Sequence, residues 1–219
     1  MGSEMCIRDR FENVEEFDID FLLMGSGSYA TATAQALANK LIAVAELRKD
    51  AVAFISPNKS TFISGAGTDS ATVASAADIT NNVLEFYAPI TSSTYAVLDS
   101  GYKYMFDRFG NTFRYIPLNG DIAGTCARND INNFPWFSPA GTARGAILNA
   151  VKLGYNPNQA QRDKLYTNRI NPVIFSPGAG IVLFGDKTAF GKSSAFDRIN
   201  VRRLFIFIEN AIELSLIHI

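Results

Sequence analysis

The feature that most constrains the fold lies near the N-terminus, where two apolar strand patterns flank a helix pattern. Residues 17–24 alternate and then become continuously apolar, which is typical of a buried β-strand. In residues 31–49, apolar side chains recur at spacings of three and four, while Arg48 and other polar residues face away. Residues 51–56 are again apolar and end at Pro57. Two buried strands joined by a helix predict a β-α-β unit, with neighbouring parallel strands and a right-handed connection.

The rest of the chain extends this α/β pattern. Residues 102–107 and 112–117 predict a β-hairpin, because they flank a turn marked by Gly110 and Asn111. The pattern of residues 81–98 fits helix and strand equally well and stays open. We therefore expect an α/β fold with a layered, mostly parallel sheet flanked by helices. The remaining expected elements are helices over 70–77, 120–130, 159–168 and 197–213, and short strands over 170–175 and 181–184.

The charge balance argues against nucleic-acid and membrane partners. The 219 residues include 20 basic and 21 acidic side chains, so the net charge is −1 at pH 7. Such a chain has no basic field to attract phosphate backbones or anionic lipids. No apolar run approaches the ~18 residues that a membrane span needs, and residues 1–24 show no signal-peptide pattern. We expect no membrane partner and no direct contact with nucleic acid.

Both ends of the chain differ from the rest. Residues 1–10 and 214–219 share no pattern with their neighbours and resemble translated sequencing-adapter read-through. We expect residues 1–10 to be non-native or disordered and 214–219 to be a non-native tail. These segments contain the only histidine, His218, and one of the two cysteines, Cys6. The other cysteine, Cys126, then has no partner for an intramolecular disulfide.

A glycine-rich turn offers the clearest route to an enzymatic function. Gly25-x-Gly27-x-x-Ala30 lies between the first strand and the first helix, which matches the dinucleotide-binding fingerprint in spacing and setting. The fingerprint also needs an acidic residue at the end of the second strand, whereas that strand ends at Ser56 and Pro57. A nucleotide-binding α/β enzyme using this turn is therefore the alternative function. The simpler interpretation is a tight turn that needs glycine only for its backbone.

Other catalytic patterns are incomplete. The segment from Gly185 to Ser193 resembles a phosphate-binding loop, but Asp186 stands where the first glycine is required. Serine and cysteine nucleophiles need an imidazole as base, and the only histidine is His218 in the C-terminal tail. The aspartates show no calcium-loop spacing. We expect no catalytic residue, no metal site and no cofactor.

Several stretches, taken in order, resemble the tail sheath proteins of contractile-tailed bacteriophages of the myovirus type. The most informative are residues 135–145, 171–188 and 199–209. Each stretch is short, but their order and spacing together are specific, and the resemblance covers roughly residues 17–213. The other matching stretches are residues 34–43, 48–57, 139–145, 161–166, 180–185 and 200–204.

The resemblance implies a fold and an assembly. It implies a subtilisin-like α/β sheath domain without protease activity at residues 11–190, then the start of a truncated C-terminal α+β domain at 191–213. Copies of such proteins form hexameric rings that stack into a helical sleeve around the tail tube protein, with baseplate and tail terminator proteins as further partners. The sleeve contracts and drives the tube through the host envelope without nucleotide hydrolysis, as a bistable assembly. The expected location is the virion tail, after assembly in the cytoplasm of the host bacterium.

Under this resemblance, three arginines are candidates for contacts between subunits or domains. Arg144 lies in the loop at 139–145, and Arg202 and Arg203 lie in the helix expected at 197–213. The apolar stripe of that helix is expected to be partly exposed, which would lower solubility. The stripe consists of Leu204, Phe205, Ile208 and Ile212.

Overall fold

A computed structural model describes residues 12, 14, 16–27, 30–64, 72–73 and 75–217. At its centre is a four-stranded sheet in the order β1-β2-β5-β9, in which every pairing is parallel. Helix α2 (Thr31–Arg48) joins β1 to β2, so the predicted β-α-β unit is confirmed. Helix α3 (Ala76–Tyr87) lies between β2 and β5 in the chain. The strands of this sheet are β1 (Phe21–Leu23), β2 (Val52–Ile55), β5 (Ala96–Asp99) and β9 (Ile170–Asn171).

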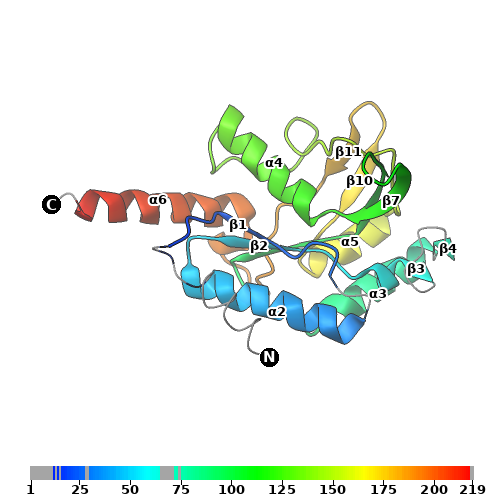
Figure 1. Cartoon of the computed structure of the whole chain (residues 1–219), viewed down its shortest axis with the longest axis horizontal. Helices are drawn as coiled ribbons and strands as arrows, with labels where there is room; N and C mark the ends of the chain where they lie inside the picture. Colours follow the sequence, from blue (N-terminus) through cyan, green and yellow to red (C-terminus); the bar gives the residue numbers. More distant parts are fainter. Residues whose placement is uncertain are drawn as a thin grey trace.

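Helices cover both faces of the central sheet (Figure 1). Successive residues of a strand point to opposite faces. Ala53 and Ile55 of β2 therefore join a core cluster with α2, α3 and α5 (Gln159–Thr167), whereas Val52 and Phe54 join a second cluster with α4 (Asn119–Asn132). The second cluster also includes residues of β11 (Gly180–Leu183) and α6 (Ile199–Ile217). The predicted layered α/β fold with a mostly parallel sheet is confirmed.

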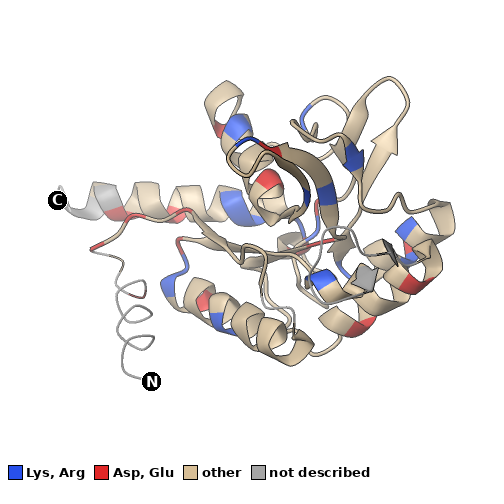
Figure 2. Ribbon diagram, turned by 45° about the vertical axis from the view of Figure 1, so that its right-hand side comes forward, with Lys and Arg blue, Asp and Glu red and all other residues tan. Residues whose placement is uncertain are grey.

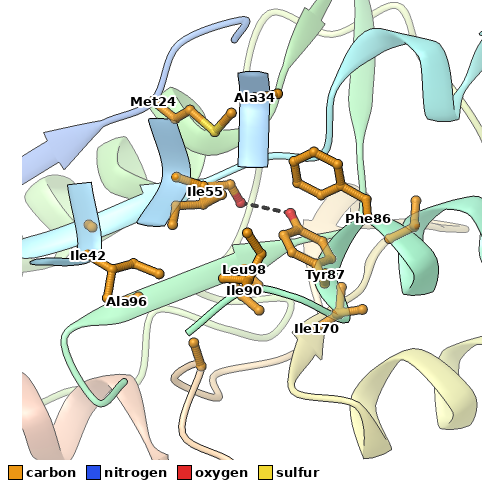
Figure 3. Packing of buried hydrophobic residues seen from close by; sticks show 14 of the residues in the cluster. Met24, Ala34, Ile42, Ile55, Phe86, Tyr87, Ile90, Ala96, Leu98 and Ile170 are labelled. Atoms are coloured by element: carbon orange, nitrogen blue, oxygen red, sulfur yellow. Dashed lines mark hydrogen bonds between the residues drawn. The ribbon is translucent and has the colours of Figure 1, made fainter. Parts of the chain in front are cut away.

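Small side chains let α2 lie close to the sheet. Ala34, Ala38, Ile42 and Ala45 are all fully buried and recur at helical spacing. Figure 3 shows Ala34 and Ile42 in this core together with Tyr87, whose hydroxyl donates to the carbonyl oxygen of Ile55 at 3.0 Å.

Two expectations about this unit are wrong. Arg48 does not face away, because the chain turns at Lys49 (φ +65°) and the Arg48 guanidinium binds both carboxylate oxygens of Asp50 at 2.9 and 2.7 Å. Arg48 is 5 % exposed. The first strand is not fully buried, because β1 is the edge of the sheet and Leu23 is 49 % exposed.

Two hairpins and a short strand pair surround the central sheet. The predicted hairpin is confirmed as β6 (Tyr102–Asp107) and β7 (Thr112–Pro117), and β8 (Lys152–Leu153) pairs with β6. The second hairpin is β10 (Val173–Ser176) with β11. The remaining elements are β3 (Ile63–Ser64) paired with β4 (Thr72–Val73), and two 3-10 turns, η1 (Lys59–Thr61) and η2 (Ala195–Asp197).

The expected strand over residues 170–175 is two strands in two different sheets. Pro172 separates them because proline has no N–H to donate to a strand ladder. β9 ends before it and pairs with β5, while β10 begins after it and pairs with β11. The expected strand at 181–184 is β11.

The helix predictions succeed to different degrees. The helices at 120–130 and 159–168 are confirmed as α4 and α5, and that at 197–213 is confirmed as α6. Of the helix expected over 70–77, residues 76 and 77 begin α3, but Thr72–Val73 form β4 and Ser75 caps α3 by accepting from the N–H of Asp78 at 3.2 Å. Residues 81–98, whose sequence pattern fitted helix and strand equally well, contain both, namely the end of α3 and the start of β5.

The chain ends bear on two further expectations. Residues 1–10, 218 and 219 lie outside the described residues, and with them Cys6 and His218. Helix α6 continues to Ile217, so the boundary expected after residue 213 is not the end of a helix. Within the described part of the chain, no helix combines the length and apolarity required to cross a bilayer.

Candidate functional site

Two of the most informative stretches of the sequence, residues 135–145 and 171–188, meet in space. In the loop at 135–145, the N–H of Gly141 donates to the carbonyl oxygen of Leu183 at 2.8 Å. The N–H of Leu183 in turn donates to the carbonyl oxygen of Gly145 at 2.7 Å. A Cβ atom on Gly145 would lie 2.7 Å from the Leu183 oxygen, so this approach requires glycine. The loop is therefore fixed against β11 by backbone contacts.

Arg144 extends from this loop as a half-buried side chain. Its Nε donates to the carbonyl oxygen of Ser138 at 2.7 Å, and its guanidinium lies 5.4 Å from the centre of the Phe137 ring. The sequence analysis missed Arg128 of α4, whose Nη2 donates to the carbonyl oxygens of Arg144 and Ala146 at 2.8 and 2.7 Å. The contact of Arg144 with another subunit or domain stays a prediction.

Arg202 and Arg203 hold α6 against the body of the molecule, and each is only 8 % exposed. The Arg202 guanidinium lies between two rings, 4.2 Å from the centre of Tyr95 and 4.3 Å from that of Phe196. It also donates to the hydroxyl of Thr94 at 2.8 Å. Phe196 is only six positions away, but Thr94 and Tyr95 precede Arg202 by 108 and 107 residues, so no local pattern could have identified these two partners.

Arg203 uses a different set of partners. Its Nη2 lies 2.5 Å from Oδ2 of Asp130 on α4, and its guanidinium lies over the ring of Phe21 in β1 at 5.2 Å. The two arginines thus join α6 to β1, to α4 and to the segment that precedes β5. Their involvement in contacts with other subunits stays a prediction.

Helix α6 also carries four large apolar side chains that are exposed. Phe205, Phe207, Ile208 and Ile212 are 40, 48, 40 and 54 % exposed. The prediction of a partly exposed stripe on this helix is therefore confirmed for three of its members, and Phe207 adds to it. The aromatic surface continues from α6 onto the loop after α4, because Phe207 packs edge-on against Trp136, which stacks on Phe134 at 4.7 Å between ring centres.

The glycine turn between β1 and α2 is held by a side chain of the protein itself. Gly25 and Gly27 both adopt positive φ angles, of 67° and 60°. The side-chain amide of Asn119 donates to the carbonyl oxygen of Gly25 at 2.7 Å, and a Cβ on Gly27 would lie 2.8 Å from Cε of Met24. Residues 28 and 29 of the fingerprint lie outside the described residues. The glycines are explained by the tight turn alone.

A buried polar network stands next to this turn, at the carboxyl ends of β2 and β5. Ser56 Oγ donates to Asp99 Oδ2 at 2.5 Å and accepts from the backbone N–H of Asn119 at 3.0 Å. Burial raises the pKa of Asp99 to about 8, so this carboxyl group is protonated at neutral pH. Asp99 is thus an acidic side chain enclosed in the core, at 1 % exposed. Among the described residues, no histidine stands beside Ser56 to act as an imidazole base.

The segment that resembles a phosphate loop is part of an ion-pair cluster. Asp186 accepts from Arg198 at 2.5 Å, from Ser138 at 3.0 Å and from Tyr166 at 3.3 Å. The adjacent Lys187 lies over the Tyr166 ring at 4.1 Å. Because these charges are already paired inside the fold, the segment does not form a phosphate-binding loop. It is the connection between β11 and α6. The described residues also contain no cluster of three or more metal-ligating side chains.

Comparison with known proteins agrees with the resemblance seen in the sequence. Residues 4–189 match the model of a family described as the phage tail sheath protein central domain. The tail sheath protein of Enterobacteria phage T4 is 39 % identical over 210 residues, covering 93 % of this chain and 31 % of the relative. The tail sheath protein of Vibrio phage KVP40 is 45 % identical over 173 residues, covering 77 % of this chain and 26 % of the relative. The matches therefore span between about a quarter and a third of the length of these curated relatives, at 26 and 31 %.

Solved structures show the same fold. The contracted helical sheath of the anti-feeding prophage matches with a TM-score of 0.68 and 17 % identity, over 98 % of this chain and 51 % of the other. The contracted sheath complex of the extracellular contractile injection system PVC matches with a TM-score of 0.63 and 18 % identity, over 95 % of this chain and 51 % of the other. Together with the identity to curated relatives and the family match over residues 4–189, this places the chain in the phage tail sheath protein family.

Proposed function

We propose that this chain is a structural part of a contractile phage tail sheath and that it carries no enzymatic activity. Its copies would form hexameric rings that stack into a helical sleeve around the tail tube protein. Contraction of the sleeve would drive the tube through the host envelope. The observation that carries this proposal is the 39 % identity to a curated tail sheath protein over nearly the whole chain.

Two features of the structure support an assembly function. The exposed apolar face of α6 and the adjoining aromatic loop form a surface that water does not favour, and such surfaces are typical of protein–protein contacts. The charged groups inside the fold are paired with one another, as Arg203 with Asp130 and Arg198 with Asp186. This leaves the molecule suited to contacts between large surfaces rather than to chemistry on a small substrate.

Further parts of the proposal come from the family. The baseplate and tail terminator proteins would bind the two ends of the sleeve, in the virion tail, after assembly in the host cytoplasm. Residues 11–190 would form the subtilisin-like sheath domain, and 191–213 would begin a C-terminal domain. The packing of α6 through Arg202 and Arg203 would then set how this second part is held.

Negative-stain electron microscopy of the product of the complete reading frame tests the proposal. The expected result is sleeves or stacked rings of uniform diameter. A protein that stays dispersed at high concentration, under salt conditions that promote sheath assembly, would contradict it.

A titration with a labelled dinucleotide tests the enzymatic alternative. The proposal expects no saturable binding to the turn at Gly25 and Gly27. Binding in the micromolar range that is lost in the Gly27→Asp variant would overturn the structural interpretation in favour of a nucleotide-using enzyme.

A further inference from the structure

A cleft of about 530 Å³ opens at the junction of β1, β2, α4 and α6. Its walls are mainly apolar, with Phe21 of β1 and Phe207 of α6 among them. Three carboxylates also line it: Asp20 before β1, Asp50 before β2, and Asp130 on α4. Among the described residues of the lining, Arg203 is the one basic group, and it is already paired with Asp130. The cleft is therefore apolar inside and negative at its rim.

Two of these carboxylates have a basic partner, because Asp50 is bound by Arg48 and Asp130 by Arg203, which leaves Asp20 without an ion-pair partner among the described residues. Oδ1 of Asp130 is buried and receives no hydrogen bond from the described residues. Partial burial raises the pKa of Asp20, and the neighbouring carboxylate of Asp18 raises it further. The carboxylates of Asp130 and Asp50 also raise this pKa, whereas the Arg203 guanidinium lowers it. A cation with an apolar body would satisfy both the walls and the rim of such a cleft.

The chain itself carries such a group, on the tip of the β6–β7 hairpin. Phe109 is 100 % exposed there, and its neighbour Arg108 is also exposed. The neighbouring charges Asp107 and Arg114 are paired with each other at 3.1 Å, so Arg108 contributes an extra positive charge. The tip thus presents an aromatic ring and a cation side by side.

The shape of this tip is fixed before any contact is made. Oδ1 of Asp107 accepts from the N–H of Phe109 at 3.0 Å, and a Cβ on Gly110 would collide with the side chains of Arg114 and Asp107. The backbone N–H groups of Gly110 and Phe109 lower the pKa of Asp107, which keeps this acceptor ionised. A preorganised loop loses little conformational entropy when it docks.

The tip and the cleft cannot meet within one copy. Figure 1 places β7 and α6 on opposite sides of the molecule. In Figure 2 the basic part of α6 lies against the body, and acidic residues follow toward its end. A contact between two different surfaces of identical chains is heterologous, and repeating it builds rings or helical filaments rather than closed pairs.

We infer that the Arg108–Phe109 tip of one copy docks in the cleft between β1, α4 and α6 of the next copy. The Phe109 ring would pack on the apolar walls, and the Arg108 guanidinium would face the carboxylates of Asp20 and Asp130. This inference rests on the proposed sheath function and adds to it a specific contact between subunits.

Site-directed cross-linking tests the contact directly. One version of the protein carries Phe109→Cys and another carries Ala211→Cys in the cleft wall. Cys6 is replaced by serine in both, and Cys126 can stay, because burial raises the pKa of its thiol to about 12 and makes it unreactive. A short bismaleimide should join the two versions when they are mixed but neither version to itself. A Phe175→Cys version, exposed on the other hairpin, is the matched control and should not cross-link to Ala211→Cys.

Two variants test the chemistry of the contact. Phe109→Ala should weaken association by at least ~30-fold if the ring is a central anchor, whereas Phe175→Ala should not. Arg108→Glu should weaken it by at least ~10-fold, and adding Asp20→Arg should restore most of the loss. Lys40→Glu, a charge reversal at an exposed position of α2, should have no such effect.

The outcomes separate this inference from the proposed function. Sleeves that form normally from Phe109→Ala and Arg108→Glu, without the mixed cross-link, would overturn the inference and leave the sheath function standing. A cross-link of Phe109→Cys to itself would show a symmetric contact and also overturn it. Protection of Ala211→Cys from a soluble maleimide in dispersed monomers would show that the chain's own segments fill the cleft, with the same consequence. Failure of the unchanged protein to assemble, together with failure of the mixed cysteine versions to cross-link, would reject the function as well.

Discussion

The central sheet and helix α6 are held in the molecule by different kinds of contact. Between β2, β5 and α2, the contacts are almost entirely apolar, and Ala38, Ile42, Phe54 and Leu98 are each at most 1 % exposed. The side of α6 that faces the body is held largely by two arginines, with Ile199 and Ile206 beside them. Apolar contacts of this type depend little on salt or pH, whereas buried ion pairs and cation–ring contacts are directional and depend on both partners. The difference suggests a rigid core with a helix whose attachment can be altered separately.

Truncation in the sheet should give the largest loss of stability. Phe54→Ala removes a fully buried ring that packs edge-on against Phe21 at 5.4 Å. The free energy of unfolding should fall by about 3–5 kcal/mol, measured by urea denaturation. Phe109→Ala, at a fully exposed ring, is the control and should change it by less than ~0.5 kcal/mol. Equal changes in the free energy of unfolding for Phe54→Ala and Phe109→Ala would contradict this account of an apolar sheet core.

Removal of one α6 anchor should have a smaller effect that depends on its partner. Arg203→Met leaves the carboxylate of Asp130 without its ion pair, and we expect a loss of about 2 kcal/mol. This is less than for a fully buried pair, because the Asp130 side chain remains 29 % exposed. The double variant Arg203→Met/Asp130→Asn should recover part of the loss. If the double variant loses as much free energy of unfolding as the two single variants together, the two groups do not act as a pair.

The pH dependence of stability should arise in part from the sheet. Folded Asp99 keeps its proton up to about pH 8, whereas an unfolded aspartic acid releases it near 3.8. The unfolded state therefore binds fewer protons between these values, and stability falls as pH rises, by at most ~1.4 kcal/mol per pH unit. Above about pH 8 this decline ends. Asp99→Asn should flatten the profile between pH 5 and 8, measured by thermal unfolding in ~unit pH steps. An unchanged slope would show that Asp99 is ionised in the folded protein.

Changes on the outer face of α6 should leave stability almost unchanged. Ile212→Ser replaces a side chain that is 54 % exposed, so the free energy of unfolding should change by less than ~0.5 kcal/mol. Its effect should appear instead as weaker self-association in light scattering. Leu47→Ser on α2, at a side chain 61 % exposed, is the matched control for surface apolarity. Equal weakening by both variants would mean that general hydrophobicity, not this face, drives association.

The same difference between the central sheet and α6 explains which parts of the structure could be predicted from the sequence. The β-α-β unit was predictable because its pattern is local: residues on one face of α2 recur every three or four positions, and each strand is a short apolar run. The hairpin at Gly110 and Asn111 was predictable for the same reason. The split at Pro172 was missed because the two apolar runs on either side of it are continuous in sequence, although they belong to different sheets.

The attachment of α6 could not be predicted from local pattern. Arg202 contacts Thr94, which is 108 positions away, and Arg203 contacts Asp130, which is 73 positions away. An arginine in a helix ordinarily faces solvent, and nothing in its neighbourhood in the sequence indicates burial. The resemblance to sheath proteins singled out Arg144, Arg202 and Arg203, but not their partners. The cleft beside Arg203 combines residues from four elements and was likewise invisible until the fold brought them together.

Hydrogen–deuterium exchange, compared between dispersed protein and assembled sleeves, tests the central claim most directly. If the chain is a sheath subunit with its contacts at α6 and the β6–β7 tip, exchange should slow in α6 and around Phe109. The amides of β2 and β5 should exchange equally slowly in both states, because they are already buried in the sheet. Slowing confined to the Gly25–Gly27 turn, or no difference between the two samples, would contradict the account.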